Sequence, residues 1–275
     1  MQERVQTKLQ KFANNENINI TEFGILADSI DMSVIVTHTI PKQIRDEIPT
    51  LNRFGYMKFE WDEFCRGFVE YAKKSQDLVL EIGPAYGWVT HRALEQDIKI
   101  IAADISKEHL EVLLKGAPTD KLGNLYVYLG AFPNEIELPK ESLGSILASR
   151  ILHFLEGDQI EDGLDKIYNW LKPNGKLFCS NCSTQHYSMN EEMLDIYKEQ
   201  KRAGDKWPAV IRNQKELAPE HASYLEDLFH PLDIEIIERV LPEHGFKIDK
   251  IKLFDYPSDI YSGGKGHVGF VATKM

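Results

Sequence analysis

The sequence predicts an α/β fold: a doubly wound, mostly parallel seven-stranded sheet with a C-terminal antiparallel hairpin and a helical N-terminal cap. Three observations support this. Apolar runs alternate with amphipathic stretches from residue 77 onward, which is typical of a parallel sheet with helices on both faces. The first run ends in a turn of small residues. The last two β-rich runs are separated only by a Pro/Gly/Ser-rich turn, so they are expected to pair antiparallel.

Residues 1–75 form the predicted cap, and residues 76–275 form the predicted core domain. In the cap, apolar side chains recur at helical spacing after Asp62, which is a suitable N-cap residue; they are Phe64, Phe68, Val69 and Ala72. The stretch at 40–49 predicts short helices between its prolines.

The core alternates strands and helices in a regular order. Ser106 is suited to begin the second helix and Gly116 to end it. The expected strands are 77–83, 99–105, 124–130, 145–149 and 176–181, and the expected helices are 88–96, 106–116 and 157–175.

A polar segment at about 184–225 interrupts this pattern after the fifth strand, and we expect it to be a lid insertion. A helix that begins after Asp233 and stops at Gly245 follows it. The two strands of the predicted hairpin, 246–256 and 266–274, complete the sheet.

The overall charge argues against some partners. With 43 acidic and 32 basic residues, the formal net charge is −11, and no run of Lys and Arg exceeds two, so we expect no nucleic-acid substrate. The N-terminus lacks the apolar segment of a signal peptide, and no stretch approaches the length of a membrane span, so we expect a cytoplasmic protein. The sequence leaves the oligomeric state open.

The three cysteines, Cys65, Cys179 and Cys182, are too few and odd in number for a disulfide scaffold, and they suit a reducing compartment. Cys179 and Cys182 form a C-x-x-C. A zinc site built on this motif requires a second pair of ligands, and a redox site requires a thioredoxin-like context. Because neither is visible in the sequence, we interpret the pair as core or edge residues and expect no metal.

The segment from Glu81 to Gly87 is the part of the sequence that indicates a ligand-binding site. A strand ends at Ile82, and Gly83, Ala85 and Gly87 then form a turn before a helix, which lets the backbone approach a ligand. Seventeen residues after Gly87 the second strand ends in Asp104, whose carboxylate can accept hydrogen bonds from a ribose diol. The pattern therefore predicts a nucleoside-containing cofactor at a topological switch point.

The nature of the cofactor follows from two side chains. A dinucleotide fingerprint has a third glycine at the start of the helix, but here Trp88 follows Gly87. Glu81 would repel phosphates and suits a cationic ligand. A nicotinamide-dependent oxidoreductase is the rival interpretation that these side chains disfavour.

The stretch Glu81-Ile82-Gly83-Pro84-Ala85-Tyr86-Gly87 resembles the first motif of the class I, Rossmann-like S-adenosylmethionine-dependent methyltransferases. Asp104, the fourth strand and the turn into the fifth strand also resemble that family in order and spacing. The resemblance covers residues 77–180 well and 226–275 in outline. It implies S-adenosylmethionine as cofactor and the cofactor-binding residues Glu81, Gly83, Pro84, Ala85, Gly87, Asp104, Ile105, Ala131, Phe132 and Ser149.

The sequence also departs from the family pattern. Ala85 replaces the middle glycine of the motif, and Gly130-Ala131-Phe132 stands where an acid often meets the adenine, so adenine recognition is expected to rest on backbone groups and on Phe132. Residues 1–75 and 184–225 match no part of the family pattern.

The expected reaction is direct in-line transfer of the activated methyl group to a small-molecule acceptor in a pocket lidded by these two segments. The sequence leaves the acceptor, the methylated atom and the need for a general base open. His153, just beyond the fourth strand, is a weak catalytic candidate. Two alternatives remain: a cofactor-binding protein without catalysis, and a methyltransferase that acts on a protein.

Overall fold

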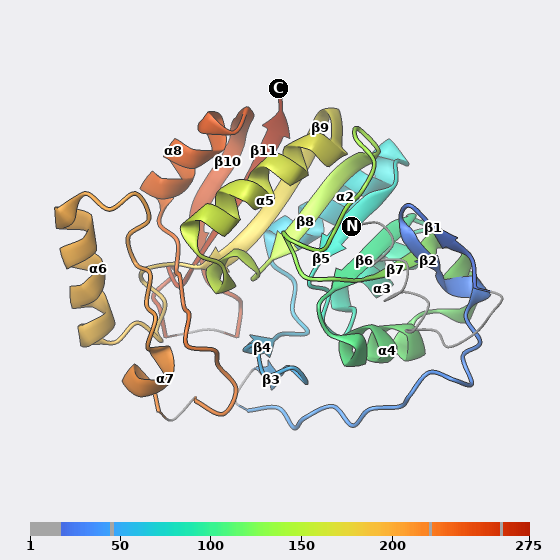
Figure 1. The fold of residues 1–275 in the computed structure, drawn as a ribbon, viewed down its shortest axis with the longest axis horizontal. Helices are drawn as coiled ribbons and strands as arrows, with labels where there is room; N and C mark the ends of the chain where they lie inside the picture. The colour runs from blue at the N-terminus through green and yellow to red at the C-terminus, as the bar shows by residue number, and fades with distance from the viewer. Residues whose placement is uncertain (1–17, 45–46, 220–221, 259–260) are drawn as a thin grey trace.

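The computed structural model describes residues 18–44, 47–219, 222–258 and 261–275. Its main feature is a nine-stranded sheet of order β1-β2-β7-β6-β5-β8-β9-β11-β10 (Figure 1). The five central strands β5 to β9 are parallel, and β11 joins them antiparallel between β9 and β10. These strands are β5 (Val79–Ile82), β6 (Ile100–Asp104), β7 (Leu125–Leu129), β8 (Leu143–Ser149), β9 (Leu171–Cys182), β10 (Phe246–Phe254) and β11 (His267–Lys274).

The seven predicted core strands are therefore present in the predicted order along the chain. The sheet is larger than predicted because β1 (Ile20–Thr21) and β2 (Gly24–Leu26) extend it beyond β7. These strands are too short to show a period of two in the sequence, and only the pairing of Ile25 with Val127 and of Leu26 with Tyr126 places them in the sheet.

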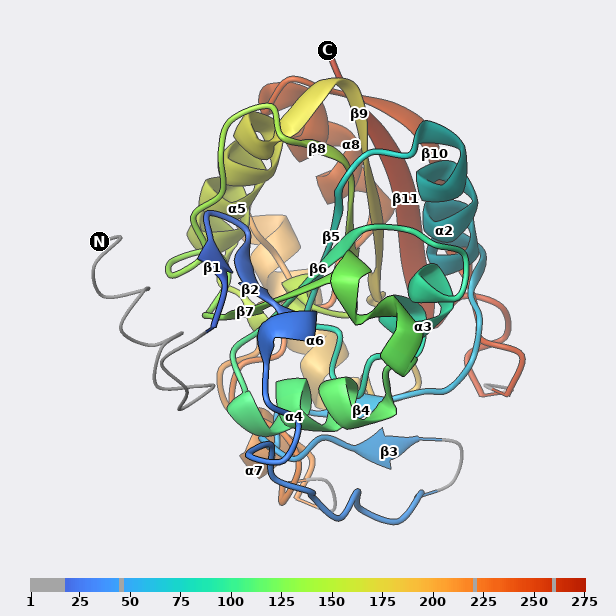
Figure 2. The ribbon, with the colours of Figure 1, turned by 90° about the vertical axis from the view of Figure 1, so that its right-hand side faces the viewer.

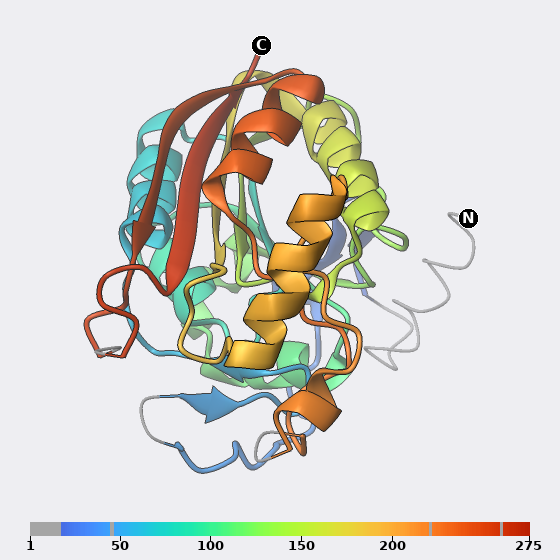
Figure 3. The ribbon, with the colours of Figure 1, turned by 90° about the vertical axis from the view of Figure 1, so that its left-hand side faces the viewer.

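Helices cover both faces of the sheet, as Figures 2 and 3 show from opposite sides. One core cluster joins α2 (Glu63–Ser75), α3 (Trp88–Leu94) and α4 (Lys107–Gly116) to side chains such as Val79 and Ala102. The other joins α5 (Gly157–Trp170) and α8 (Ile234–Glu243) to side chains such as Leu80 and Ile101. Since successive strand residues point to opposite faces, the continuous apolar runs of the sequence supply both clusters.

The two predicted caps are confirmed. Asp62 Oδ1 accepts hydrogen bonds from the backbone N–H groups of Phe64 and Cys65, both at 2.7 Å, at the start of α2. Ser106 Oγ accepts one from His109 N at the start of α4. Phe68, at helical spacing from Phe64, is fully buried in the first cluster.

The helical expectation for the rest of the cap is wrong for the described residues. The part before α2 holds β1, β2, one turn of 3-10 helix at Ala27–Ser29, and a two-stranded sheet of β3 (Ile48–Pro49) and β4 (Tyr56–Met57). Tertiary pairing overrides the local pattern here, because these short segments bind to neighbouring structure rather than forming turns of helix. Residues 1–17, 45 and 46 lie outside the described residues, and the domain boundary at 75 stays a prediction.

The interrupting segment contains α6 (Glu191–Ala203) and α7 (Gln214–Leu217), with a small apolar cluster of its own around Met193 and Ile211. It lies at the carboxyl ends of the strands, beside the β3–β4 sheet, as Figures 1 and 3 show. Among the described residues, none of the helices is both long and apolar enough to cross a membrane.

Candidate cofactor site

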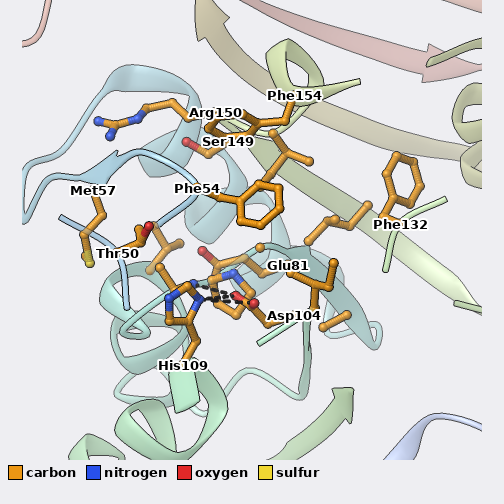
Figure 4. Close-up of a pocket in the computed structure, with 18 of the residues that line it drawn as sticks. Thr50, Phe54, Met57, Glu81, Asp104, His109, Phe132, Ser149, Arg150 and Phe154 are labelled. Atoms are coloured by element: carbon orange, nitrogen blue, oxygen red, sulfur yellow. Dashed lines mark hydrogen bonds and ion pairs between the residues drawn. The ribbon is translucent and has the colours of Figure 1, made fainter. Parts of the chain in front are cut away.

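A cavity of about 220 Å³ opens at the carboxyl ends of β5, β6, β7 and β8 (Figure 4). We call it the central cavity. Nine of the ten predicted cofactor-binding residues line it: Glu81, Gly83, Pro84, Ala85, Asp104, Ile105, Ala131, Phe132 and Ser149. The topology brings these residues together because the ends of neighbouring parallel strands meet at one edge of a sheet.

The turn after β5 has the backbone conformation that its small residues predict. Gly83 and Gly87 have φ values of 68° and 82°, in the left-handed region. A Cβ on Gly83 would lie 2.1 Å from Ile151 Cδ1. Gly87 lies outside the cavity wall, where a Cβ would meet Leu113 of α4 at 2.7 Å. Gly83 thus shapes the cavity wall, whereas Gly87 permits the close packing of α3 on α4.

Asp104 connects this turn to the second strand. Its carboxylate accepts hydrogen bonds from Ser106 N at 2.8 Å and from Ala85 N at 3.2 Å, and it lies 3.2 Å from His109 Nδ1. The contacts between Asp104 and His109 are drawn in Figure 4. Ala85 has a φ of 47°, and its bond to Asp104 helps hold this conformation. Asp104 therefore fixes the turn as well as facing the cavity.

Glu81 lies at the end of β5 with its side chain on the α3 face. Its Oε2 accepts a hydrogen bond from Thr90 Oγ1 at 2.5 Å. Burial raises the pKa of the Glu81 carboxyl to about 7, against the lowering effect of the Thr90 bond, and the nearby Asp104 adds to the rise. A cation in the central cavity would favour the ionised form of Glu81.

The residues predicted to contact adenine already have partners within the protein. Ala131 N already donates a hydrogen bond to Glu135 Oε2 at 3.0 Å. The Phe132 ring packs toward Trp170 and against Gly163 of α5, so it belongs to the core as well as to the cavity wall. Ile105, whose exposed fraction is 52%, also lines the cavity with an apolar side chain.

A segment that matched no family pattern supplies one wall of the central cavity. We call residues 48–60 the lid segment. Its lining residues are Thr50, Asn52, Phe54, Tyr56, Met57, Lys58 and Glu60. Figure 4 shows the Phe54 ring between the Ser149 side of the cavity and Glu81.

The lid segment is held by bonds to the core. Tyr86 Oη donates to the Pro49 carbonyl oxygen at 2.9 Å. The Arg150 guanidinium donates to the Tyr56 carbonyl oxygen. Tyr86 itself is buried among Ile48 and Met57. The side chains that follow β5 and β8 thus position the lid over the strand ends.

We expected both segments to act as a lid over the pocket, and the insertion takes a different place from residues 48–60. Of its described residues, 184–219 and 222–225, none lines the central cavity. It supports the lid segment from outside: Gly55 N donates to the Tyr224 carbonyl oxygen at 2.7 Å, and the Tyr56 and Tyr224 rings lie 5.9 Å apart.

His153 lies away from the central cavity. It is buried beside Phe154 and Phe229 and lines a second, smaller cavity of about 80 Å³. Burial, with a smaller effect of Arg150, lowers the pKa of His153 to about 3. Its side chain is therefore a neutral, enclosed imidazole, and a catalytic role for His153 stays a prediction without geometric support.

Other lining residues were not singled out from the sequence. His109, Arg150, Ile151 and Tyr256 face the central cavity from α4, from the segment after β8 and from the loop after β10. Arg150 directly follows the predicted Ser149 and could have been included on that ground. The place of Tyr256 depends on how the C-terminal hairpin packs, for which the sequence carries no local signal.

Comparisons with known proteins agree with this geometry. Residues 79–175 match the family described as "Methyltransferase domain". A Schizosaccharomyces pombe protein named as an uncharacterized methyltransferase-like protein is 33% identical over 109 residues, which is 39% of this chain and 39% of that protein. The match thus spans about two fifths of this curated relative.

Solved structures share the fold at low sequence identity. A Methanosarcina mazei S-adenosylmethionine-dependent methyltransferase is 13% identical, with a TM-score of 0.58 over 78% of this chain and 99% of that one. The Burkholderia thailandensis 1,6-didemethyltoxoflavin-N1-methyltransferase, solved with 1,6-didemethyltoxoflavin and S-adenosylhomocysteine, is 15% identical, with a TM-score of 0.52 over 78% and 79% of the two chains.

Proposed function

Because residues 79–175 match the family described as a methyltransferase domain, and solved S-adenosylmethionine-dependent methyltransferases share the fold, we propose that this chain transfers the methyl group of S-adenosylmethionine to a small-molecule acceptor. One observation carries the proposal: Glu81, Asp104 and Ile105 face a single cavity at the strand ends, and the lid segment lines its other side.

The residues of the central cavity fit this cofactor. The Asp104 carboxylate, which has acceptor sites beyond its present bonds, would accept from the ribose hydroxyls. Ile105 would pack on the adenine, and the Ala131–Phe132 backbone would lie at its edge. The ionised Glu81 carboxylate suits the ammonium group at the amino acid end of the cofactor. The cofactor supplies an already activated methyl group when it is bound.

The part of the protein in the reaction is then to position the acceptor and exclude water. Positioning of two reactants can contribute on the order of 7–11 kcal/mol to the lowering of a barrier. The lid segment and Phe154 supply apolar walls, while Thr50, Asn52 and Tyr256 supply hydrogen-bonding groups. Such a wall, mostly apolar with a few polar groups, is typical of a site for a small molecule.

The lid segment also supports a small acceptor. A protein acceptor must bring an extended segment to the methyl group, whereas the lid segment lines one side of the central cavity. Its anchors, Tyr86 to Pro49 and Arg150 to Tyr56, favour a closed pocket over an open groove. These contacts support a small-molecule acceptor.

The test uses the full chain with methyl-labelled S-adenosylmethionine. The protein is incubated with a cell extract divided by size into a metabolite fraction and a protein fraction, and S-adenosylhomocysteine and labelled products are measured by mass spectrometry. We expect label in the metabolite fraction. Label only in the protein fraction would establish a protein acceptor, and cofactor binding without turnover in either fraction would favour a non-catalytic binding protein.

A further inference from the structure

The second cavity, next to the central one, brings together three side chains that ligate soft or borderline metal ions. Cys182 ends β9, His186 lies in the turn that follows, and His267 begins β11. Their ligand atoms all lie within 4.8 Å of one another. All three line this cavity of about 80 Å³.

The fold sets this arrangement. Cys182 and His267 are direct partners in the antiparallel ladder of β9 and β11. The His186 and His267 rings meet edge to face with centroids 5.0 Å apart. Both histidines are buried, and Cys182 is partly exposed. Two of the donors are therefore fixed by the sheet rather than by a flexible loop.

We propose that Cys182, His186 and His267 bind a zinc ion. Zinc prefers sulfur and imidazole ligands in tetrahedral geometry, and sites with three protein ligands keep a fourth position for water or substrate. Bond lengths of about 2.3 Å to sulfur and 2.0–2.1 Å to nitrogen place the donor atoms about 3.3–3.6 Å apart, so the cluster contracts by about 1 Å on binding.

The surroundings of the histidines suit this role. The Nδ1 atom of His186 lies 2.7 Å from Ser188 Oγ and 3.3 Å from Ser188 N; when Nδ1–H donates to Ser188 Oγ, this outer bond orients the ring and leaves coordination to Nε2. His267 is buried at the start of β11, and its pairing with Cys182 holds the ring beside the other two donors.

The charge around the cluster is mixed. Arg150 and Lys58 are close enough to His267 to oppose a dication. Cys182 offsets this because it binds zinc as a thiolate, releasing one proton to solvent. The Glu47 carboxylate, whose Oε2 lies 3.3 Å from the Tyr187 hydroxyl, lines the same cavity and adds a second negative charge.

The ion would face the proposed acceptor side of the molecule. Tyr56, Arg150 and Phe154 line both the second cavity and the central one. The metal site does not depend on methyl transfer and can be tested without a substrate.

The experiment begins with chelator-treated full chain that is reloaded with zinc and, separately, with Co²⁺. We expect one zinc per chain by elemental mass spectrometry and a sulfur-to-cobalt charge-transfer absorption band. Cys182→Ser should abolish the band. Loss of a residue that only supports a ligand weakens metal binding roughly 10–100-fold, so loss of the ligand itself should weaken zinc binding by at least that factor. Cys179→Ala, which removes the neighbouring buried cysteine, should keep both.

A measurement on the unmodified protein covers the case in which Cys182→Ser fails to fold. Zinc should slow alkylation of Cys182, followed by peptide mass spectrometry in the metal-free and zinc-loaded chains. An alkylation rate that zinc leaves unchanged, or an absorption band that persists in folded Cys182→Ser, would overturn the proposal. S-adenosylmethionine binding, measured in parallel, reports separately on the proposed methyltransferase function.

Discussion

At the scale of single residues, the buried carboxyl of Glu81 couples cofactor binding to pH. Its pKa is about 7 in the free protein, and a bound cation favours the ionised form. We therefore expect S-adenosylmethionine affinity to be about tenfold lower at pH 6 than at pH 8, because ionisation one unit below the pKa costs about 1.4 kcal/mol. Titration calorimetry at the two pH values measures this.

The control for that prediction is Glu81→Gln, which retains a partner for Thr90 but does not titrate. This variant should bind S-adenosylmethionine more weakly than the wild type at pH 8, and its affinity should depend less on pH. The pH dependence that remains in the variant comes from the cofactor itself. Equal slopes in the wild type and in Glu81→Gln would remove Glu81 from the cofactor site.

Asp104 gives a second prediction at this scale. Charge-assisted hydrogen bonds are worth about 1.5–3 kcal/mol each, so Asp104→Ala should weaken cofactor binding by at least roughly tenfold. The same carboxylate holds Ala85 and Ser106, so thermal unfolding must be recorded for each variant. Asp104→Asn keeps an acceptor for Ser106 N and should lose less affinity. A folded Asp104→Ala with wild-type affinity would contradict the ribose role.

At the scale of elements, the start of α2 is fixed by one buried carboxylate. Asp62 caps the helix with Oδ1, and its Oδ2 accepts from Tyr256 Oη at 2.8 Å and from Ser180 Oγ at 3.3 Å. Because Tyr256 lies beyond β10, this network joins three parts of the chain behind the central cavity.

Asp62→Ala should therefore destabilise more than an ordinary cap mutation. Loss of the cap costs about 0.5–2 kcal/mol, and an unsatisfied buried hydroxyl on Tyr256 adds about 1–3 kcal/mol. Urea denaturation measures the sum. Asp62→Asn, which keeps the cap oxygen, should lose clearly less stability than Asp62→Ala, and equal losses in the two variants would show that the cap oxygen contributes nothing.

The lid segment is a second element whose position depends on one side chain. Tyr86→Phe removes the hydrogen bond to the Pro49 carbonyl oxygen. Loss of this bond lowers the free energy that holds the lid segment closed by about 1 kcal/mol, which shifts its opening equilibrium about fivefold. Tryptic cleavage at Arg53 should accelerate by that factor. Tyr128→Phe, which removes a hydroxyl bonded to Glu137 away from the lid, is the matched control and should leave the rate unchanged.

At the scale of the whole molecule, buried histidines make the fold sensitive to acid. The pKa of His153 is about 3 in the folded chain, below the ordinary value of 6.5, so its contribution to stability is present above pH 6.5 and is lost as the pH falls toward 3. The effect of Glu81 on stability has the opposite pH dependence. Its raised pKa stabilises the fold below pH 4.5, and this contribution is lost as the pH rises through 7.

His153→Gln should accordingly make the free energy of unfolding depend less on pH. Between pH 7 and pH 5, the free energy of unfolding of the wild type should fall by about 2 kcal/mol more than that of the variant. At pH 5 the folded chain keeps His153 neutral 1.5 pH units below the pKa of the unfolded chain, and this costs about 2 kcal/mol. Urea denaturation at both pH values measures the difference. A loss of equal size in the two proteins would mean that His153 is protonated without unfolding.

The sequence by itself determined the central sheet and one half of the site. Its apolar runs specify β5 to β9 because strands buried on both faces need continuous apolar sequence. The glycine turn and Asp104 follow those strands directly, so local order along the chain places them at one edge.

Only the tertiary structure decided the other half. The lid segment reaches the cavity through bonds such as Tyr86 to Pro49, 37 residues apart in sequence, and Cys182 meets His267 only because β11 pairs with β9. Neither contact leaves a periodic or spacing signal, because each joins segments that the sheet brings together from distant parts of the chain. The α2 cap was visible in the sequence, but its bond to Tyr256 was not, for the same physical reason.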